Sequence, residues 1–343
     1  MKTIKSSIIL FLLPVFALLT ACGGGTDKKT EDTTPPEPPK EENVVPSAET
    51  ITFSVEGLYP EGVSYDPTRK GFIVTSLTKG QLGLVDNEGN YEVLVQDSAL
   101  ISAIGVKVDA PRNRILVCNS DPGVSVQTNP DKQGKFGQLL VYNLKTLKRV
   151  RLIELSEMLP EQRHFANDLI VDKDGNIYIT DSFSPIIYKV DNTNTASVFF
   201  QDSTLAGEGF GLNGIVLHPD GYLLAAKYND GTLYKIPTED PKAYTQVTLP
   251  QAYPGADGLI WKDPSNLVLI ANASNEPTNK AIHLQSSDGW TSATEMGTFD
   301  TGNVFPTTAT TADGQLYILY AHLNVLFGGE PPVSEFTIQK LPF

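Results

Sequence analysis

Residues 166–182 read ANDLIVDKDGNIYITDS: two polar residues, a short apolar run, an Asp-Gly turn and a second apolar run rich in strand-forming side chains. The same pattern, with an Asp-Gly or Asp-Pro turn in most copies, returns at five further positions, which start at Pro60, Ala103, Leu212, Ala256 and Pro306. A strand-built repeat of about 40 to 50 residues is typical of a β-propeller, in which each repeat forms one blade. The sequence therefore predicts an all-β fold, a six-bladed β-propeller with four-stranded blades and a central channel.

Local signals agree with this fold. Asp-Gly pairs at positions 174–175, 220–221 and 313–314 lie between apolar runs and predict hairpin turns. Residues 51–57, ITFSVEG, precede the first full repeat, and we expect them to pair with EFTIQKL at 335–341 and close the ring. Helix signals are scarce, and Pro160 interrupts the best one, at 155–165. Cys118 lies in the run RILVCN, which favours a buried strand thiol.

The N-terminal residues resemble an export signal. Lys2 and Lys5 precede an apolar stretch at 8–19, which is too short for a comfortable membrane span. The following residues, Leu-Thr-Ala-Cys at 19–22, resemble a bacterial lipobox, which implies cleavage before Cys22 and lipid attachment to its thiol. The alternative is an ordinary secretory signal in which Cys22 is incidental.

Residues 22–48 contain almost no large apolar side chain and are rich in Pro, Glu and Lys, so they predict a disordered tether. The expected organisation is a lipoprotein signal peptide at 1–21, a lipidated tether at 22–48 and the propeller at 49–343. The protein would then be exported to the bacterial cell envelope and meet the membrane only through its lipid anchor. A formal net charge of −14 argues against nucleic acid and anionic lipid as partners.

Polar residues recur where each repeat begins, and the inner strands of a propeller bring such positions to one end of the channel. The six positions are Glu61, Ile104, Asn167, Asn213, Asp257 and Thr307. Two carboxylates and two amide oxygens suit Ca²⁺, Mg²⁺ or Mn²⁺, and Zn²⁺ stays open although neither His nor Cys is present. The sequence predicts a metal site formed by Glu61, Asn167, Asn213 and Asp257. The alternative is that each residue merely forms a turn.

The repeat starts EG, ND, NG and DG, at Glu61, Asn167, Asn213 and Asp257, resemble the family of senescence marker protein, gluconolactonase and luciferin-regenerating enzyme. The resemblance extends from Pro60 to about residue 341. It implies a six-bladed propeller with a divalent cation, most readily Ca²⁺, and hydrolysis of lactones or related esters. It also implies that Asp257 is the general base for the attacking water and that Asn167 contacts the metal or the substrate.

The sequence departs from the sugar-lactone members at one position. Animal members carry Arg two residues before the ring Asn, whereas this chain has Phe165 there, with Arg163 and His164 just upstream. Specificity for gluconolactone is therefore in doubt. The second strands return to the same end of the channel, so four further residues are candidates for the substrate pocket, namely Asp181, Lys227, Asn272 and His322. The alternative places these candidates at the surface, at strand ends.

Three functions remain open. The first is a monomeric, metal-dependent hydrolase of lactones or esters; no GxSxG motif is present and the four histidines show no triad spacing, which disfavours a serine nucleophile. The second is a propeller lipoprotein that binds a ligand or protein and keeps the cation for structure, because one fold hosts many functions. The third, a condensation chemistry of the strictosidine-synthase type, needs a pocket acid beyond Glu61 and ranks last.

Overall fold

The structure of the protein is a computed structural model that describes residues 49–272 and 279–343. The expected signal peptide, the lipidated Cys22 and the tether all lie outside the described residues, so these three expectations stay predictions.

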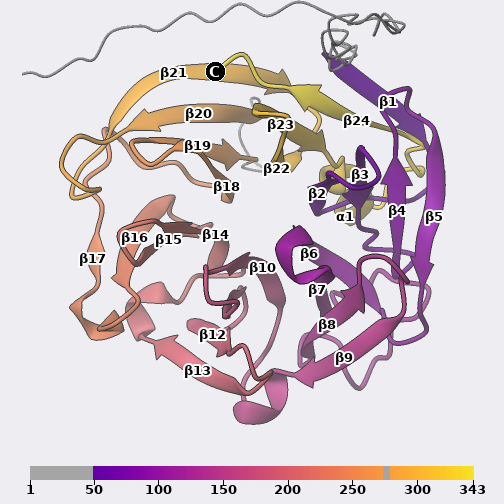
Figure 1. The fold of residues 1–343 in the computed structure, drawn as a ribbon, viewed down its shortest axis with the longest axis horizontal. Coiled ribbons are helices and arrows are strands. Elements are labelled where there is room, and N and C mark those ends of the chain that lie inside the picture. The colour runs from indigo at the N-terminus through magenta and orange to yellow at the C-terminus, as the bar shows by residue number, and fades with distance from the viewer. Residues whose placement is uncertain (1–48, 273–278) are drawn as a thin grey trace, which may run out of the picture. The chain divides into compact units, whose positions relative to one another are not determined.

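The described residues form six four-stranded antiparallel sheets arranged around a central axis, which confirms the predicted six-bladed propeller (Figure 1). In five sheets the four strands follow chain order, and the sixth combines both ends of the domain. The strands are β1 (Thr50–Ser54), β2 (Val63–Asp66), β3 (Gly71–Val74), β4 (Gln81–Val85), β5 (Tyr91–Gln96), β6 (Ser102–Asp109), β7 (Arg114–Ser120), β8 (Gly137–Asn143), β9 (Arg149–Glu154), β10 (Ala166–Val171), β11 (Ile177–Asp181), β12 (Ile186–Val190), β13 (Ala196–Gln201), β14 (Leu212–His218), β15 (Tyr222–Lys227), β16 (Thr232–Pro237), β17 (Thr245–Gln246), β18 (Ala256–Asp263), β19 (Asn266–Ala271), β20 (Asn279–Gln285), β21 (Thr294–Gly302), β22 (Pro306–Ala312), β23 (Gln315–Tyr320) and β24 (Glu335–Lys340).

The ring closes through the predicted pairing of the two ends of the domain. Strand β1 is the outer strand of the last blade and pairs antiparallel with β24, with Ile51 opposite Ile338 and Phe53 opposite Phe336. All four side chains are buried. Closure of this kind removes the free sheet edges that would otherwise be open to aggregation.

Burial follows the position of a strand within its blade. Every residue of the second strands β11 and β15 is buried, because blades pack against both faces of these strands. The outermost strand β1 alternates between exposed and buried residues, as a strand with one solvated face should. The Asp-Gly pairs form the predicted hairpin turns between β10 and β11, β14 and β15, and β22 and β23. Cys118 is fully buried in β7, as expected.

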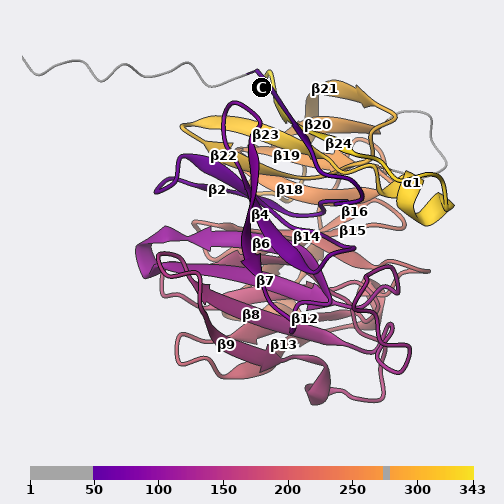
Figure 2. The same cartoon turned by 90° about the vertical axis from the view of Figure 1, so that its right-hand side faces the viewer.

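Helical structure is limited. The stretch 155–165 forms only one 3₁₀ turn, at Ser156–Met158, and the α-helix in the described ranges is α1 (Leu323–Gly328), which lies at one face of the ring (Figure 2). The helix starts after His322 and ends before Gly329, both of which have left-handed backbone conformations. In the described part of the chain, no helix has the length and apolarity needed to cross a membrane.

Candidate functional site

The innermost strands share a local irregularity that directs polar side chains toward the axis. In β10, β14 and β18 the pairing register shifts just after the first residue, between Ala166 and Leu169 in the case of β10. Such bulges re-aim side chains out of the regular alternation. Asn167, Asn213 and Asp257 are the residues that immediately follow the first residue of these three strands.

Glycine at the next position lets neighbouring blades approach closely. A Cβ atom on Gly214 would lie 2.2 Å from the main-chain oxygen of Asp257, and one on Gly62 would lie 2.5 Å from that of Ile104. No larger residue fits without moving the backbone. The chain thus holds the ring positions of adjacent blades in direct contact across the blade boundaries.

The structure brings the four predicted ligand residues to one place. Glu61, Asn167, Asn213 and Asp257 line a single cavity in the channel, and each is at most 9% exposed. The Thr75 hydroxyl, directly after the second strand β3, supports this ring: the Glu61 and Gly62 main-chain N–H groups donate to Thr75 Oγ1 at 3.2 and 2.7 Å. The structure thus places these four side chains around one cavity, while their role as ligands and the bound ion stay predictions.

Asn167 has an amide oxygen without a hydrogen-bond donor. Its Nδ2 donates to Ser182 Oγ at 2.8 Å, and this bond orients the amide. Its Oδ1 is buried and accepts no hydrogen bond. A buried polar atom without a partner is costly, so an unpaired oxygen at this point needs an explanation such as an ion.

The carboxylate of Asp257 is held in position by two amides. Asn272 donates to its Oδ2, and Asn213 also donates to the carboxylate through its side chain. Burial nevertheless raises the pKa of Asp257 well above its usual value; these two hydrogen bonds oppose the rise and the charge of Asp168 adds to it. Burial likewise raises the pKa of Glu61, with further contributions from Asp257 and Asp168.

These features fit a divalent cation. Glu61 and Asp257 are carboxylates whose charge is disfavoured by burial, and Asn167 offers an unpaired amide oxygen. A divalent cation would supply the missing charge and partner, and oxygen donors are what Ca²⁺ prefers. In residues 49–272 and 279–343, however, no three His, Cys, Asp or Glu side chains are grouped closely enough to form a metal site of their own. The amide oxygens would therefore have to contribute to binding.

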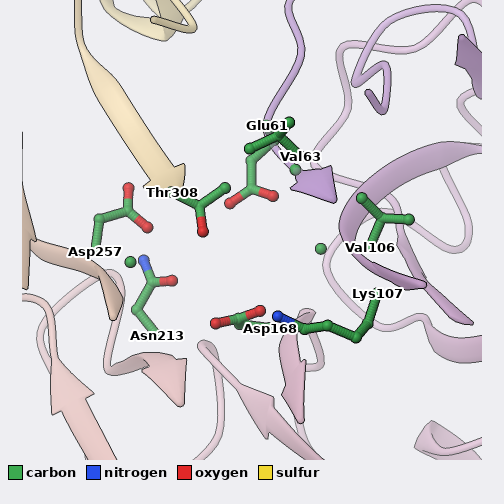
Figure 3. A pocket seen from close by; sticks show the side chains of 11 residues that line it. Glu61, Val63, Val106, Lys107, Asp168, Asn213, Asp257 and Thr308 are labelled. Atoms are coloured by element: carbon green, nitrogen blue, oxygen red, sulfur yellow. The ribbon is translucent and has the colours of Figure 1, made fainter. Parts of the chain in front are cut away.

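A second, small cavity adjoins the ring. It shares Glu61, Asn213 and Asp257 with the first cavity and is also lined by Asp168 and Lys107. Figure 3 shows the Lys107 ammonium group directed toward the Asp168 carboxylate, with the ring side chains around the same space. Its volume of about 10 Å³ matches one water molecule.

Asp168 was missed by the sequence reasoning. Its carboxylate accepts hydrogen bonds from the main-chain N–H groups of Leu169 at 2.8 Å and Ile215 at 3.1 Å. Burial raises its pKa, and the charge of Lys107 opposes the rise. The sequence did contain a signal for Asp168: it is the charged residue at a repeat position that holds glycine in four other copies.

Three predicted pocket residues lie elsewhere. His164 and Asp181 do not line either channel cavity; both are fully buried, and their side chains bond to each other at 2.8 Å. Asp181 also accepts from the Tyr188 hydroxyl and from the Phe165 main-chain N–H, which makes it a structural hub. Arg163 packs its guanidinium group over the Phe183 ring, 4.3 Å from the ring centroid.

Of the other second-strand candidates for the substrate pocket, one contacts the ring and two do not. Asn272 contacts the ring through Asp257, but it is itself fully buried and so acts on Asp257 rather than on a substrate. Lys227 is paired with Asp230 at 2.8 Å, and His322 packs against Phe336 beside the start of α1. Neither Lys227 nor His322 lines either of these two cavities, because local partners hold both side chains.

Comparison with known proteins identifies the fold. A search of family models finds no match, and neither does a search of curated proteins by sequence. Solved structures do match: the major allergen Mala s 1 of Malassezia sympodialis is 20% identical with a TM-score of 0.65, covering 85% of this chain and 96% of that one. A gluconolactonase of Xanthomonas campestris is 14% identical with a TM-score of 0.58, covering 85% and 89%.

A third structure, the calcium-binding protein regucalcin of Agrobacterium tumefaciens, is 16% identical with a TM-score of 0.56, covering 83% of this chain and 91% of the other. The predicted resemblance in fold to gluconolactonases and their relatives is thus confirmed. At these identities the likeness concerns the fold. The chain is a six-bladed β-propeller of the architecture found in gluconolactonase and regucalcin structures.

Proposed function

We propose that the protein is a divalent-cation-dependent hydrolase of lactones or related esters. The observation that carries the proposal is the ring itself: two carboxylates with raised pKa values and a buried amide oxygen without a donor line one channel cavity. The structural likeness to a gluconolactonase and to a calcium-binding regucalcin supports it. Ca²⁺ is the proposed ion because all the donors are oxygens.

The residues of the ring would have two roles, ion binding and proton transfer. Glu61, Asn167, Asn213 and Asp257 would hold the ion, which when bound would polarise the substrate carbonyl and stabilise the negative charge that develops on it. Asn272 orients the Asp257 carboxylate by donating to its Oδ2, and Asp257 would accept a proton from a water molecule.

In the proposed hydrolysis, each bond that forms is matched by one that breaks. The water oxygen adds to the carbonyl carbon while Asp257 takes its proton. The ring C–O bond breaks, and the leaving oxygen receives the proton back from Asp257. The product is the open hydroxy acid. Asp257 takes and returns the same proton, so the carboxylate is regenerated in each cycle.

The test measures hydrolysis of a panel of lactones by residues 45–343. Acid release is the readout, and the assay is run with Ca²⁺, Mn²⁺ or Zn²⁺ and with a chelator. Turnover that requires the ion and is lost in Asp257→Asn would support the proposal. If the ion raises the melting temperature but no lactone or ester is turned over, the second function, a binding propeller with a structural cation, is favoured instead.

The location is also a proposal. The lipobox-like residues that end at Cys22 and the following tether support a lipid-anchored protein of the bacterial envelope. Such an anchor would keep the propeller near the membrane without further membrane contact.

A further inference from the structure

The cavity above the ring has an apolar wall. Its volume is about 290 Å³, at the small end of the range for ligand pockets. Beyond the four polar ring residues, the described residues that line it are apolar or aromatic: Leu77, Phe165, Phe210, Tyr228, Phe305, Leu323 and Phe327. The floor of the pocket is therefore polar and its wall apolar.

Aromatic packing fixes one side of this wall. Phe165 meets Phe210 edge to face, with ring centroids 5.5 Å apart, and both contact Phe183 at 5.2 Å. Phe165 is only 4% exposed. Interlocked rings of this kind change position little, so the wall is preformed rather than assembled around a ligand.

No positive charge faces this cavity among the eleven described residues that line it. Arg163 is stacked on Phe183, and Lys227 is occupied by Asp230 and the Thr204 main-chain oxygen. A sugar lactone would bring several hydroxyl groups against this wall, where, apart from the Tyr228 hydroxyl, the described side chains of the wall offer no hydrogen-bonding group. Unpaired hydroxyl groups of this kind oppose binding.

The opening of the pocket is apolar as well. Phe327, on α1, lines the cavity and is 53% exposed. A large apolar side chain at the rim of a concave site commonly contacts a ligand. Its exposure also means that replacing it should leave the fold intact.

We propose that this pocket accepts an uncharged lactone or ester with an apolar substituent, and that it discriminates against polyhydroxylated sugar lactones. The ester carbonyl would lie at the polar ring and the substituent against Phe165, Phe210 and Phe327. The inference concerns the substrate class and rests on the proposed function for its chemistry. The apolar binding can be tested separately.

The experiment compares two δ-lactones with the same six-membered ring, δ-decalactone with its alkyl chain and glucono-δ-lactone with its hydroxyl groups. Turnover is measured with Ca²⁺ present. Binding is measured by calorimetry with an alkyl-substituted cyclohexanone, which has a ring, a carbonyl and an apolar tail but cannot be hydrolysed. Phe327→Ser is compared with Met296→Ser, because Met296 on β21 is equally exposed, at 52%, and does not line the cavity.

We expect δ-decalactone to have the larger kcat/KM. Phe327→Ser should weaken binding of the alkyl ketone on the order of tenfold, and Met296→Ser should leave it unchanged. Binding of the ketone with turnover of neither lactone would support the pocket and contradict the hydrolase. Preferred turnover of glucono-δ-lactone, or equal ketone binding by both variants, would overturn the inference while leaving the hydrolase intact.

Discussion

Asn272 donates hydrogen bonds from one amide nitrogen to the Asp257 carboxylate and to the main-chain oxygen of Pro306, the latter at 2.8 Å. The two acceptors lie in different blades, at the starts of β18 and β22. Asn272 therefore ties the orientation of the candidate general base to the packing between these blades, although it is itself completely buried.

Removing this tie should loosen the ring. We expect Asn272→Ala to weaken Ca²⁺ affinity about 10- to 100-fold, as is usual when a residue that orients a ligand is lost. Calorimetric titration with Ca²⁺ would measure the change. Asn90→Ala is the matched control, because Asn90 makes the same amide-to-carboxylate bond to Asp86 on an exposed turn. Equal affinity in both variants would contradict the role given to Asn272.

Asp257→Asn should impair Ca²⁺ binding without lowering the stability of the ion-free protein. The substitution keeps the shape of the side chain but removes a buried charge, so the ion-free protein should be as stable as the wild type or more stable at neutral pH. Ca²⁺ at about 100 times its wild-type Kd should stabilise the wild type by about 2.7 kcal/mol and the variant far less. Thermal unfolding with chelator and with Ca²⁺ gives both quantities. A full Ca²⁺ response in the variant would remove Asp257 from the site.

The ion-free protein should lose stability as the pH rises. The pKa values of Glu61 and Asp257 are raised in the folded state by burial, so the folded protein holds protons that the unfolded chain releases. Their contribution to the free energy of unfolding is fully present below the unfolded pKa of about 4 and is lost as the pH rises through the folded values.

Melting temperatures in chelator across this range should therefore fall with pH, and Ca²⁺ should restore more stability at high pH than at low pH. In Glu61→Gln the fall should be smaller. A melting temperature in chelator that climbs steadily toward neutral pH in the wild type would show that the two carboxylates are not buried together as described.

The buried pair of His164 and Asp181 should act on stability. Burial alone would lower the pKa of His164, but the hydrogen bond and charge of Asp181 raise it overall. Asp181→Ala should lower the free energy of unfolding by about 3–5 kcal/mol, because it leaves a buried partner uncompensated. It should also lower the pKa of His164, which an NMR titration of the ring protons would show. An unchanged pKa would contradict the contact.

The proposed anchor has a direct test. Cys22→Ser in the full chain removes the thiol that would carry the lipid, so the protein should move from the membrane fraction to the soluble fraction of the envelope. Fractionation with Cys118→Ser as the matched control measures this, since Cys118 is buried in the propeller. Membrane retention of the Cys22 variant would show that something other than this lipid holds it.

The sequence could predict the polar ring of the site because the ring positions recur in each repeat. Glu61, Asn167, Asn213 and Asp257 occupy one register of the six copies, and a closed ring brings equal registers to one axis, so their meeting followed from the fold alone. Phe165, Phe210 and Phe305 carry a weaker signal, since each stands two or three residues before the ring position of its blade.

Periodicity determined the blades, the hairpin turns and the pairing of the chain ends, because alternating apolar residues and Asp-Gly turns act locally and add up around a closed ring. Only the tertiary structure decided where His164, Lys227 and His322 lie. Side chains at strand ends pair with whichever partner lies nearby, as His164 does with Asp181 and Lys227 with Asp230. It also decided that Asp168 lies in the channel, because the hydrogen bond from the Ile215 main chain comes from the neighbouring blade.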